Sequence, residues 1–478
     1  MSLKTKVVSA AKWSAFAEIA SKGITPIIFI VLAWILTPKD FGLVAIATMV
    51  ISFSHIFWDA GLSKALIQRQ GDVEKTANIV FWTNMVLGVV IYGLLFLSAG
   101  FIAHLFKEPL AEAVIKVQGL QIILASLFSV QTALFQKELN FKKLFYVRLL
   151  TSVLPGFASI PFALWGFGYW ALVVGSLVGA FGQLILLWLI SSWRPQLKYD
   201  TQIAKQLFRF GLWVTGEGLL GWVFVWGDAL IVGAYLGTED LGLYRTGSTF
   251  VLMFYTVIFT PLSPVLFSAL SRLQNDREKL NSVISKVTLI SILVSIPLGV
   301  GLFSLRELIE MVIFGEKWMG IAVVIGVFAL LNALTWIVGF HPEGYRAIGL
   351  PDINTKIMLF GLCYYLPVYL MAIPYGLTTF LWARLACIFL TFTLRLYIAY
   401  RLFSLPIFRL FGKMSGMILY SIVVYFVMHM THTNLQHSVS NGLVLLIFEV
   451  LIGMGLYLLY FLYDVKYYKS AFHFLKEG

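Results

Sequence analysis

The stretch Leu36–Leu43 (LTPKDFGL) returns 200 positions later as Leu236–Leu243 (LGTEDLGL), and each copy lies between two long apolar runs. Four of the eight positions match, and Asp-x-Gly-Leu is the informative part because leucine is frequent in so apolar a chain. A second, weaker repeat follows each copy, at Ser63–Arg69 and at Ser268–Arg272. Its two copies match only when the offset of 200 is changed by a few residues, about one helical turn. In each copy Asp can cap the next helix and Gly allows close packing. The repetition predicts a duplicated membrane lobe, an organisation found in many transporters.

The composition excludes a soluble protein. The 478 residues are 60% hydrophobic and 12% charged, and the mean hydropathy is +0.88. Soluble domains carry about 25% charged residues, so this chain could not cover a surface that faces water. Its apolar runs of 18 or more residues indicate helices that cross a membrane.

The apolar runs predict an all-α integral membrane protein with about fourteen transmembrane helices. Two of the runs are too long for one span, and we expect hairpins at Gly166–Gly168 and at Tyr375–Gly376. The expected spans are 13–36, 41–62, 77–105, 117–134, 146–166, 168–190, 209–235, 241–270, 282–304, 319–340, 355–374, 377–400, 413–431 and 442–463.

The net charge of +12 reflects topology and not nucleic-acid binding. With both termini in the cytoplasm, inward segments hold 26 of the 35 Lys and Arg, outward segments hold 5, and 4 lie inside spans. This skew follows the positive-inside rule and fixes the orientation. Anionic lipid headgroups are the expected contact of the basic loops.

Six spans in each half predict two parallel lobes. The predicted division is an N-terminal lobe at 1–190, a cytoplasmic linker at 191–208, a C-terminal lobe at 209–403, and 404–478 with two extra spans and a cytoplasmic tail. Six is an even number, so both lobes enter the membrane from the same side. The loops are too short for a soluble catalytic domain, and we therefore expect no enzyme.

Charged side chains inside spans are the candidate functional residues, because each costs about 2.5–3.5 kcal/mol at the bilayer centre. Glu18 and Lys22 are four residues apart and can pair on one helix face. Glu217 falls one residue from the repeat equivalent of Glu18, so each lobe carries a carboxylate in its first helix. The carboxylates either bind a coupling ion or proton, or form structural ion pairs; the candidates are Glu18, Glu217, Asp228 and Asp59.

Four cations are candidates to receive an anionic substrate. The arginine guanidinium offers a planar fork of donors that matches pyrophosphate. Arg384 and Arg395 are eleven residues apart and share a helix face. The alternative role is snorkelling to the nearer membrane surface. The candidate cations are Arg245, Arg384, Lys22 and Arg395.

No metal site is expected. His429, His432 and His437 gather near the last outward segment, but the sequence places no carboxylate or cysteine beside them. We find no Gly-Lys loop that would cradle phosphate, so a built-in ATPase is not expected. Net transport would then draw on a proton or sodium gradient, on a partner, or on consumption of the substrate at the far side.

Four phrases carry a resemblance to a known family. They are Leu36–Leu43, Gly61–Ile67, Gly237–Tyr244 and Pro261–Arg272. The chain resembles the Wzx-type flippases of the polysaccharide-transport family, within the multidrug/oligosaccharidyl-lipid/polysaccharide exporter superfamily. The resemblance implies a V-shaped pair of six-helix lobes with a central cationic cavity and alternating access.

The resemblance also implies a substrate and a location. The expected substrate is an undecaprenyl-pyrophosphate-linked oligosaccharide repeat unit, moved to the outer face of the bacterial plasma membrane for O-antigen, capsule or exopolysaccharide synthesis. Membrane lipids, a polysaccharide polymerase and other assembly proteins are the expected partners, and no nucleic acid. The alternative is a multidrug or peptidoglycan-precursor transporter of the same superfamily.

Overall fold

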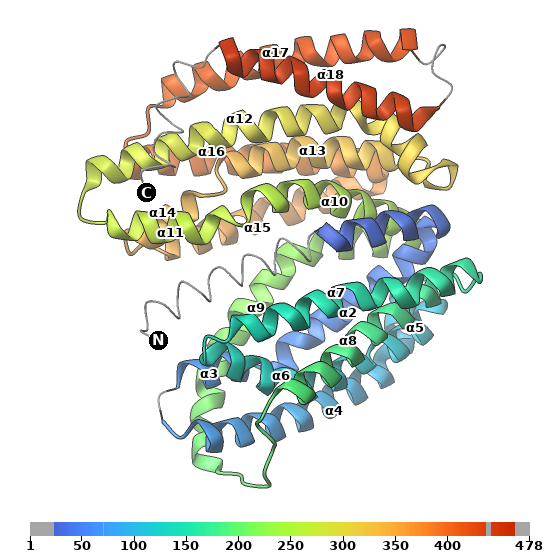
Figure 1. Ribbon diagram of the computed structural model, residues 1–478, viewed down its shortest axis with the longest axis vertical. Coiled ribbons are helices and arrows are strands. Elements are labelled where there is room, and N and C mark those ends of the chain that lie inside the picture. The colour runs from blue at the N-terminus through green and yellow to red at the C-terminus, as the bar shows by residue number, and fades with distance from the viewer. Residues whose placement is uncertain (1–22, 70, 436–440, 464–478) are drawn as a thin grey trace. The chain divides into compact units, whose positions relative to one another are not determined.

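A computed structural model describes residues 23–69, 71–435 and 441–463, and helices account for almost all of them (Figure 1). The helix Gly23–Ile35 comes first. The others are α2 (Pro38–Asp59), α3 (Leu62–Gln68), α4 (Val73–Leu105), α5 (Leu110–Gln118), α6 (Leu120–Lys137), α7 (Phe141–Leu164), α8 (Tyr169–Ile190), α9 (Thr201–Leu236), α10 (Thr238–Phe259), α11 (Leu262–Arg272), α12 (Arg277–Ile309), η1 (Glu310–Phe314), η2 (Glu316–Trp318), α13 (Ile321–Ile337), α14 (His341–Ala347), α15 (Asp352–Ala372), η3 (Ile373–Tyr375), α16 (Leu377–Phe403), α17 (Ile407–Leu435) and α18 (Gly442–Tyr463).

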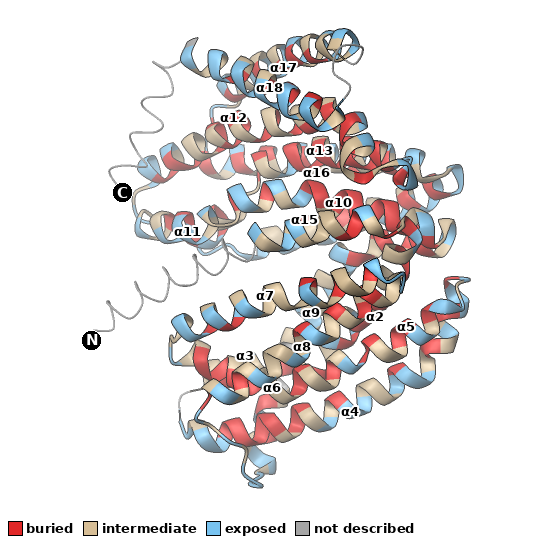
Figure 2. Ribbon diagram, turned by 45° about the vertical axis from the view of Figure 1, so that its right-hand side comes forward, coloured by how far each residue is buried: buried red, intermediate tan, exposed pale blue. Residues whose placement is uncertain are grey.

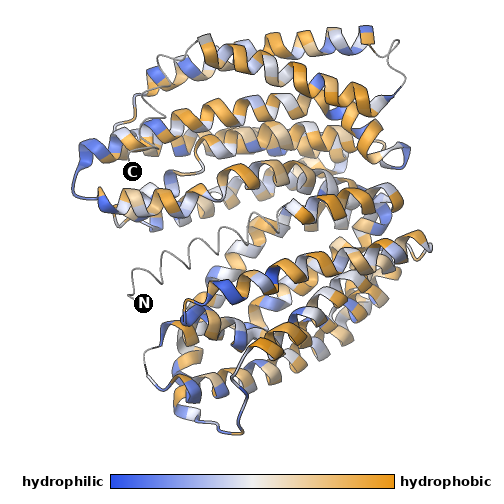
Figure 3. Ribbon diagram, viewed as in Figure 1, coloured by the Kyte–Doolittle hydropathy of each residue, from blue (hydrophilic) through white to orange (hydrophobic). Residues whose placement is uncertain are grey.

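The prediction of an all-α membrane protein is confirmed. Among the described residues, 12 helices are long and apolar enough to cross a membrane, and the bent pair of α10 and α11 makes a possible 13th. The helix Gly23–Ile35 is the described part of the first expected span. The ribbon coloured by hydropathy is mostly hydrophobic along the helices and hydrophilic toward helix ends and loops (Figure 3). The bend of 41° comes where Pro261 interrupts the helical hydrogen bonds.

Both expected hairpins are present. Gly166 (φ 84°) and Gly168 (φ 55°) make the turn between α7 and α8, and Gly376 (φ 93°) precedes α16. These positive φ angles are easy for glycine and costly for other residues. The turns bring α7 against α8 and α15 against α16.

The duplication extends beyond the repeated phrase. α2 and α10 both have 22 residues, and their first residues, Pro38 and Thr238, are 200 apart. α3 and α11 begin at Leu62 and Leu262, so the same offset persists across the helix break. α11 is four residues longer than α3, about one helical turn, so the two helices end at Arg272 and Gln68 and the shift expected for the weaker repeat stays a prediction.

The two copies of the phrase pack against each other through their glycines. A Cβ atom on Gly42 would lie 1.8 Å from the carbonyl oxygen of Thr238. A Cβ on Gly242 would lie 1.9 Å from the carbonyl oxygen of Pro38. Pro38 and Thr238 are themselves equivalent positions, so the contact is reciprocal. The expectation that glycine allows close packing here is confirmed.

The cap at the first copy differs from the expected one. Thr37, not Asp40, is the N-cap of α2, and its hydroxyl accepts a hydrogen bond from the Asp40 backbone N–H at 3.3 Å. The Asp40 carboxylate accepts in turn from the Thr37 backbone N–H at 2.9 Å. This reciprocal pair is a capping box, which satisfies two otherwise unbonded donors at the helix start.

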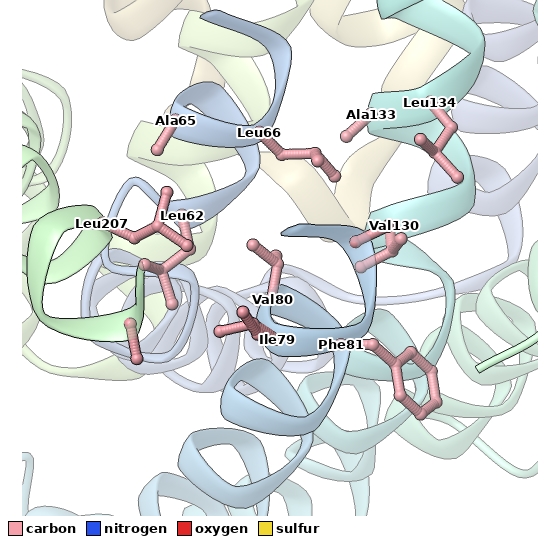
Figure 4. Close-up of a cluster of buried hydrophobic side chains, with 12 residues drawn as sticks. Leu62, Ala65, Leu66, Ile79, Val80, Phe81, Val130, Ala133, Leu134 and Leu207 are labelled. Atoms are coloured by element: carbon pink, nitrogen blue, oxygen red, sulfur yellow. The ribbon is translucent and has the colours of Figure 1, made fainter. Parts of the chain in front are cut away.

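The contacts divide the chain into two units between Arg245 and Thr246, so α9 and the start of α10 belong to the first unit. The lobe boundaries at 190 and 209 stay a prediction about the repeat. In the first unit, apolar side chains from α3, α4, α6 and α9 form a core cluster (Figure 4). In the second unit, α13 is buried along most of its length (Figure 2).

The predicted linker begins as an extended segment fixed to α4. The Trp82 indole N–H donates to the Gln196 carbonyl at 2.9 Å, and the Gln196 backbone N–H donates to Asn78 at 2.7 Å. Lys75 forms a 2.7 Å ion pair with Asp200, the N-cap of α9. The Lys75 ammonium, followed by the backbone N–H of Ile203, lowers the pKa of the Asp200 carboxyl.

Candidate functional site

A cavity of about 660 Å³ lies inside the first unit, among α2, α3, α6, α7 and α8. Ligand-binding pockets commonly measure about 300–1,000 Å³, so this one is large enough for an organic ligand. Polar and apolar side chains both line it, and it contains no lysine or arginine among the described residues. The lining residues are His55, Trp58, Asp59, Ser63, Gln121, Ala125, Phe128, Ser129, Thr132, Ala133, Gln136, Thr151, Pro155, Ser176, Gly179, Ala180 and Gln183.

Asp59 is the charged residue of this cavity that the sequence singled out. It ends α2, where the chain breaks at Ala60 (φ 41°) before α3 begins. Its Oδ1 accepts a hydrogen bond from the Ser63 hydroxyl and lies 3.4 Å from the Asn84 side-chain amide. The helix break therefore holds the carboxylate at the cavity wall, and its role in coupling stays a prediction.

Asp228 and Arg245 lie together at the end of α9 and the start of α10. Asp228 is buried and accepts a 2.8 Å hydrogen bond from the Tyr244 hydroxyl. Arg245 interacts electrostatically with Asp228, and its guanidinium lies 4.0 Å from the centre of the Trp226 ring. Both groups are thus held in one cluster, which combines a predicted coupling acid with a predicted substrate cation.

Arg384 and Arg395 lie on α16 and have different surroundings. The guanidinium of Arg384 lies 4.9 Å from the centre of the Phe328 ring on α13. Arg395 donates a hydrogen bond to the Asn354 side chain on α15 at 3.2 Å. It also interacts electrostatically with Tyr345 and with further tyrosines. Eleven residues of helix separate the two by about 16 Å, too far for one pyrophosphate to bridge.

The remaining predicted residues fall into two groups. Glu217 is exposed on α9, and no ion pair or hydrogen bond involves it within the described part of the chain. Glu18 and Lys22 lie outside the described residues, so their pairing stays a prediction. The structure therefore brings together Asp228 with Arg245 and gives every other described candidate its own surroundings.

His432, near the C-terminal end of α17, has a partner that the sequence did not reveal. Glu449 on α18 is 3% exposed, and its Oε1 lies 2.8 Å from Nδ1 of His432. The expectation that no carboxylate lies near the histidines is wrong for His432, because helix packing joins residues 17 apart, and His437 lies outside the described residues. No group of three metal-ligating side chains forms among the residues that the structure describes.

The predicted site residues were all charged, and the neutral polar side chains of the cavity were not among them. Gln121, Gln136 and Gln183 line the cavity; Gln121 and Gln183 lie inside expected spans, and Gln136 is the last residue but one of α6. Amides inside a membrane span are costly unless they meet a partner, so their presence marks a polar interior. Spacing also gave a usable clue, since Gln121 and Gln136 are 15 residues apart on α6 and share roughly one face.

Comparisons with known proteins place these features in context. A family described as "Polysaccharide biosynthesis protein" matches residues 31–323. The succinoglycan biosynthesis transport protein ExoT of Rhizobium meliloti is 27% identical over 67% of this chain and 65% of its own length. The lipopolysaccharide biosynthesis protein WzxC of Escherichia coli is 26% identical over 77% of this chain and 75% of its own length.

Solved structures show the same fold. The lipid II flippase MurJ in an inward closed conformation has a TM-score of 0.77 at 15% identity and covers 95% of this chain and 98% of its own. An inward-facing multidrug resistance transporter of the MATE family, within the MOP superfamily, has a TM-score of 0.58 at 14% identity. It covers 81% of this chain and 94% of its own.

Proposed function

Because this chain belongs to the polysaccharide biosynthesis protein family, we propose that it is a flippase for a lipid-linked oligosaccharide. The cargo is an undecaprenyl-pyrophosphate-linked repeat unit, carried from the inner to the outer face of a bacterial plasma membrane. The product serves O-antigen, capsule or exopolysaccharide synthesis. The names of ExoT and WzxC, both biosynthesis proteins for surface polysaccharides, support this cargo.

The observation that carries the proposal is arginine inside the spanning helices. The guanidinium groups of Arg245 and Arg384 lie 4.0 Å and 4.9 Å from the centres of aromatic rings. A charged side chain inside a membrane span costs free energy, so its presence there indicates a function. A guanidinium fits the pyrophosphate group, which must cross the membrane interior with the sugar. Alternating access of the two lobes would carry that group across while the lipid tail stays in the bilayer.

The transport cycle needs an energy source and an orientation. Asp59, Glu217, Asp228 and Glu18 are our candidates for coupling to a proton or sodium gradient, and we propose no cofactor. The excess of basic residues in alternate loops supports cytoplasmic termini and contact with anionic lipids. We propose a polysaccharide polymerase and other assembly proteins as partners, and no catalytic activity of the chain itself.

The test replaces Arg245 and Arg384 by alanine in a strain that depends on this chain for surface polysaccharide. We expect loss of the polysaccharide with normal protein abundance. Arg277→Ala with Arg401→Ala, two exposed arginines, is the matched control and should export normally. Normal export by the first double variant would overturn the assignment of the two cations.

Arg245 needs a second variant, because its removal leaves the buried Asp228 carboxylate without its cation. Asp228→Asn with Arg245→Gln removes both charges and keeps side chains of similar size. This variant should fold and fail to export. If it exports normally, the Asp228–Arg245 cluster is structural and Arg384 alone remains as a substrate cation.

A second candidate function keeps the fold and changes the cargo. The likeness to MurJ and to a MATE transporter favours a peptidoglycan-precursor or multidrug transporter as the alternative. A drug exporter would favour acidic groups over arginine in its binding site. Drug resistance that depends on the chain, with unchanged surface polysaccharide on its deletion, would select the alternative.

A further inference from the structure

We propose that the cavity in the first unit binds the sugar part of the lipid-linked oligosaccharide through its hydroxyl groups. This inference rests on the proposed function and adds a location and a chemistry for one part of the substrate. The pyrophosphate would bind elsewhere, at the arginines.

The charge of the lining selects the ligand class. Asp59 is the only carboxylate, and lysine and arginine are absent, among the described residues around the cavity. A pyrophosphate would meet the repulsion of Asp59 and no compensating cation. A sugar hydroxyl, by contrast, can donate a hydrogen bond to the carboxylate and exchange bonds with amides.

Two amides of the lining are available for a ligand. The side-chain amides of Gln136 on α6 and Gln183 on α8 make no hydrogen bond within the described part of the chain. Each amide has two N–H donors and a carbonyl acceptor, the combination that pairs with neighbouring hydroxyls of one sugar ring. Gln121 differs, because its amide already donates to the Ser176 hydroxyl at 2.7 Å and forms part of the wall.

Aromatic side chains complete the recognition surface. Trp58 and Phe128 line the cavity, and the ring of His55 lies 4.9 Å from that of Trp58. Trp58 is 3% exposed, and its indole N–H has no hydrogen-bond partner in the described structure. A buried donor without a partner costs about 1–3 kcal/mol, and since this N–H is itself enclosed, a ligand would accept from it only after the Trp58 ring turns toward the cavity.

The length of the cavity favours an oligosaccharide over a single sugar. Gln121 and Gln136 both line it and are 15 residues apart on α6. At the rise of an α-helix this is about 22 Å. Such a distance accommodates more than one sugar ring in a row, with amides near both ends.

The experiment measures binding by the full chain, purified into nanodiscs, with two probes. One probe is the lipid-linked repeat unit extracted from the host strain after deletion of this chain. The other is undecaprenyl pyrophosphate without sugar. The variant is Gln136→Met with Gln183→Met, which keeps side-chain length and removes hydrogen bonding. We expect its affinity for the sugar-bearing probe to fall about tenfold or more, because each lost hydrogen bond weakens binding several-fold. Its affinity for undecaprenyl pyrophosphate should not change.

Two controls keep the outcome interpretable. Gln202→Met changes an exposed glutamine outside the cavity and should bind both probes as the wild type does. Unfolding temperatures of all variants report whether they fold. Equal affinity of the Gln136/Gln183 variant and the wild type for the sugar-bearing probe would overturn the inference and leave the proposed function standing. Equal losses for both probes would overturn it as well, since the change would then not concern the sugar. Failure of the wild type to bind either probe would overturn the proposed function and the inference with it.

Discussion

The two repeats share a helical frame and differ inside it. At the offset of 200, His55 and Asp59 of α2 correspond to Tyr255 and Phe259 of α10. His55 and Asp59 line a cavity, whereas Tyr255 and Phe259 are 0% and 2% exposed. Duplication thus kept the backbone and changed the interior: one unit retains a polar cavity where the other is filled by aromatic packing.

A second difference follows from the matching hairpins. The turn glycines Gly168 and Gly376 are equivalent, which aligns Ser176 of α8 with Arg384 of α16. Ser176 faces the cavity and binds Gln121, whereas Arg384 lies against the Phe328 ring. At this pair of equivalent positions the first unit therefore has a neutral hydroxyl, and the second unit has a guanidinium.

The largest expected effect comes from giving the first unit the interior of the second. His55→Tyr with Asp59→Phe should fill much of the cavity and remove its carboxylate. We expect surface polysaccharide to fall to the level of a deletion strain, with protein abundance and unfolding temperature close to wild type. The matched control is Val86→Tyr with Leu97→Phe, at exposed positions of α4. Normal export by the cavity-filled variant would show that the cavity has no part in transport.

The opposite change tests the packed interior. Phe259→Ala removes a ring that stacks on Trp336 with centroids 4.9 Å apart. A buried Phe→Ala substitution costs about 3–5 kcal/mol, so the unfolding temperature of the purified protein should fall clearly. Asp59→Ala at the equivalent position removes a few hydrogen bonds and should cost about 1 kcal/mol. Phe408→Ala, at a side chain 95% exposed, is the control, and equal losses at positions 259 and 59 would contradict the comparison.

The sequence predicted the shared frame better than the differing interiors. Span periodicity, the turn glycines and the phrase at 36–43 and 236–243 were sufficient for the fold. These features depend on local conformation and on hydropathy, and both can be read from the residue types along the chain. The sequence also singled out Asp59 and Arg245, because a charge in an apolar run is conspicuous, and their roles stay predictions.

Side-chain partnerships could not be predicted, since they depend on which helix faces meet. Gln136 and Gln183 are far apart in sequence and line one cavity. Glu449 on α18 contacts His432 on the neighbouring helix α17. A neutral amide inside a membrane span is also weaker evidence of a functional site than a charged side chain is. The nature of the repeat's turn was half predicted: glycine packing was expected, whereas the reciprocal capping by Thr37 was not.

The glycine contact should be equally sensitive in both copies, because it belongs to the shared frame. Gly42→Ala and Gly242→Ala would each place a methyl group within 2 Å of the other copy's backbone. Overpacking of this kind costs about 1–3 kcal/mol, measurable as a lower unfolding temperature for each variant. Gly93→Ala is the control: its Cβ would meet no atom within 4 Å, and alanine favours helix, so stability should stay level or rise. A neutral Gly42→Ala would mean that the two copies are not held at this contact.

The smallest effect concerns the cap, where the copies differ again. Thr37→Ala removes the hydroxyl of the capping box and should cost about 1 kcal/mol, while Thr37→Ser should retain most of the stability. The second copy has Gly237 at this position with φ 93°, a conformation that strains any residue with a side chain. Asp240 therefore has no equivalent hydroxyl to bind, and Asp240→Ala should cost less than Asp40→Ala in the same unfolding measurement. Equal costs would show that the carboxylates act through the helix dipole at both sites and that the capping box adds nothing to the first.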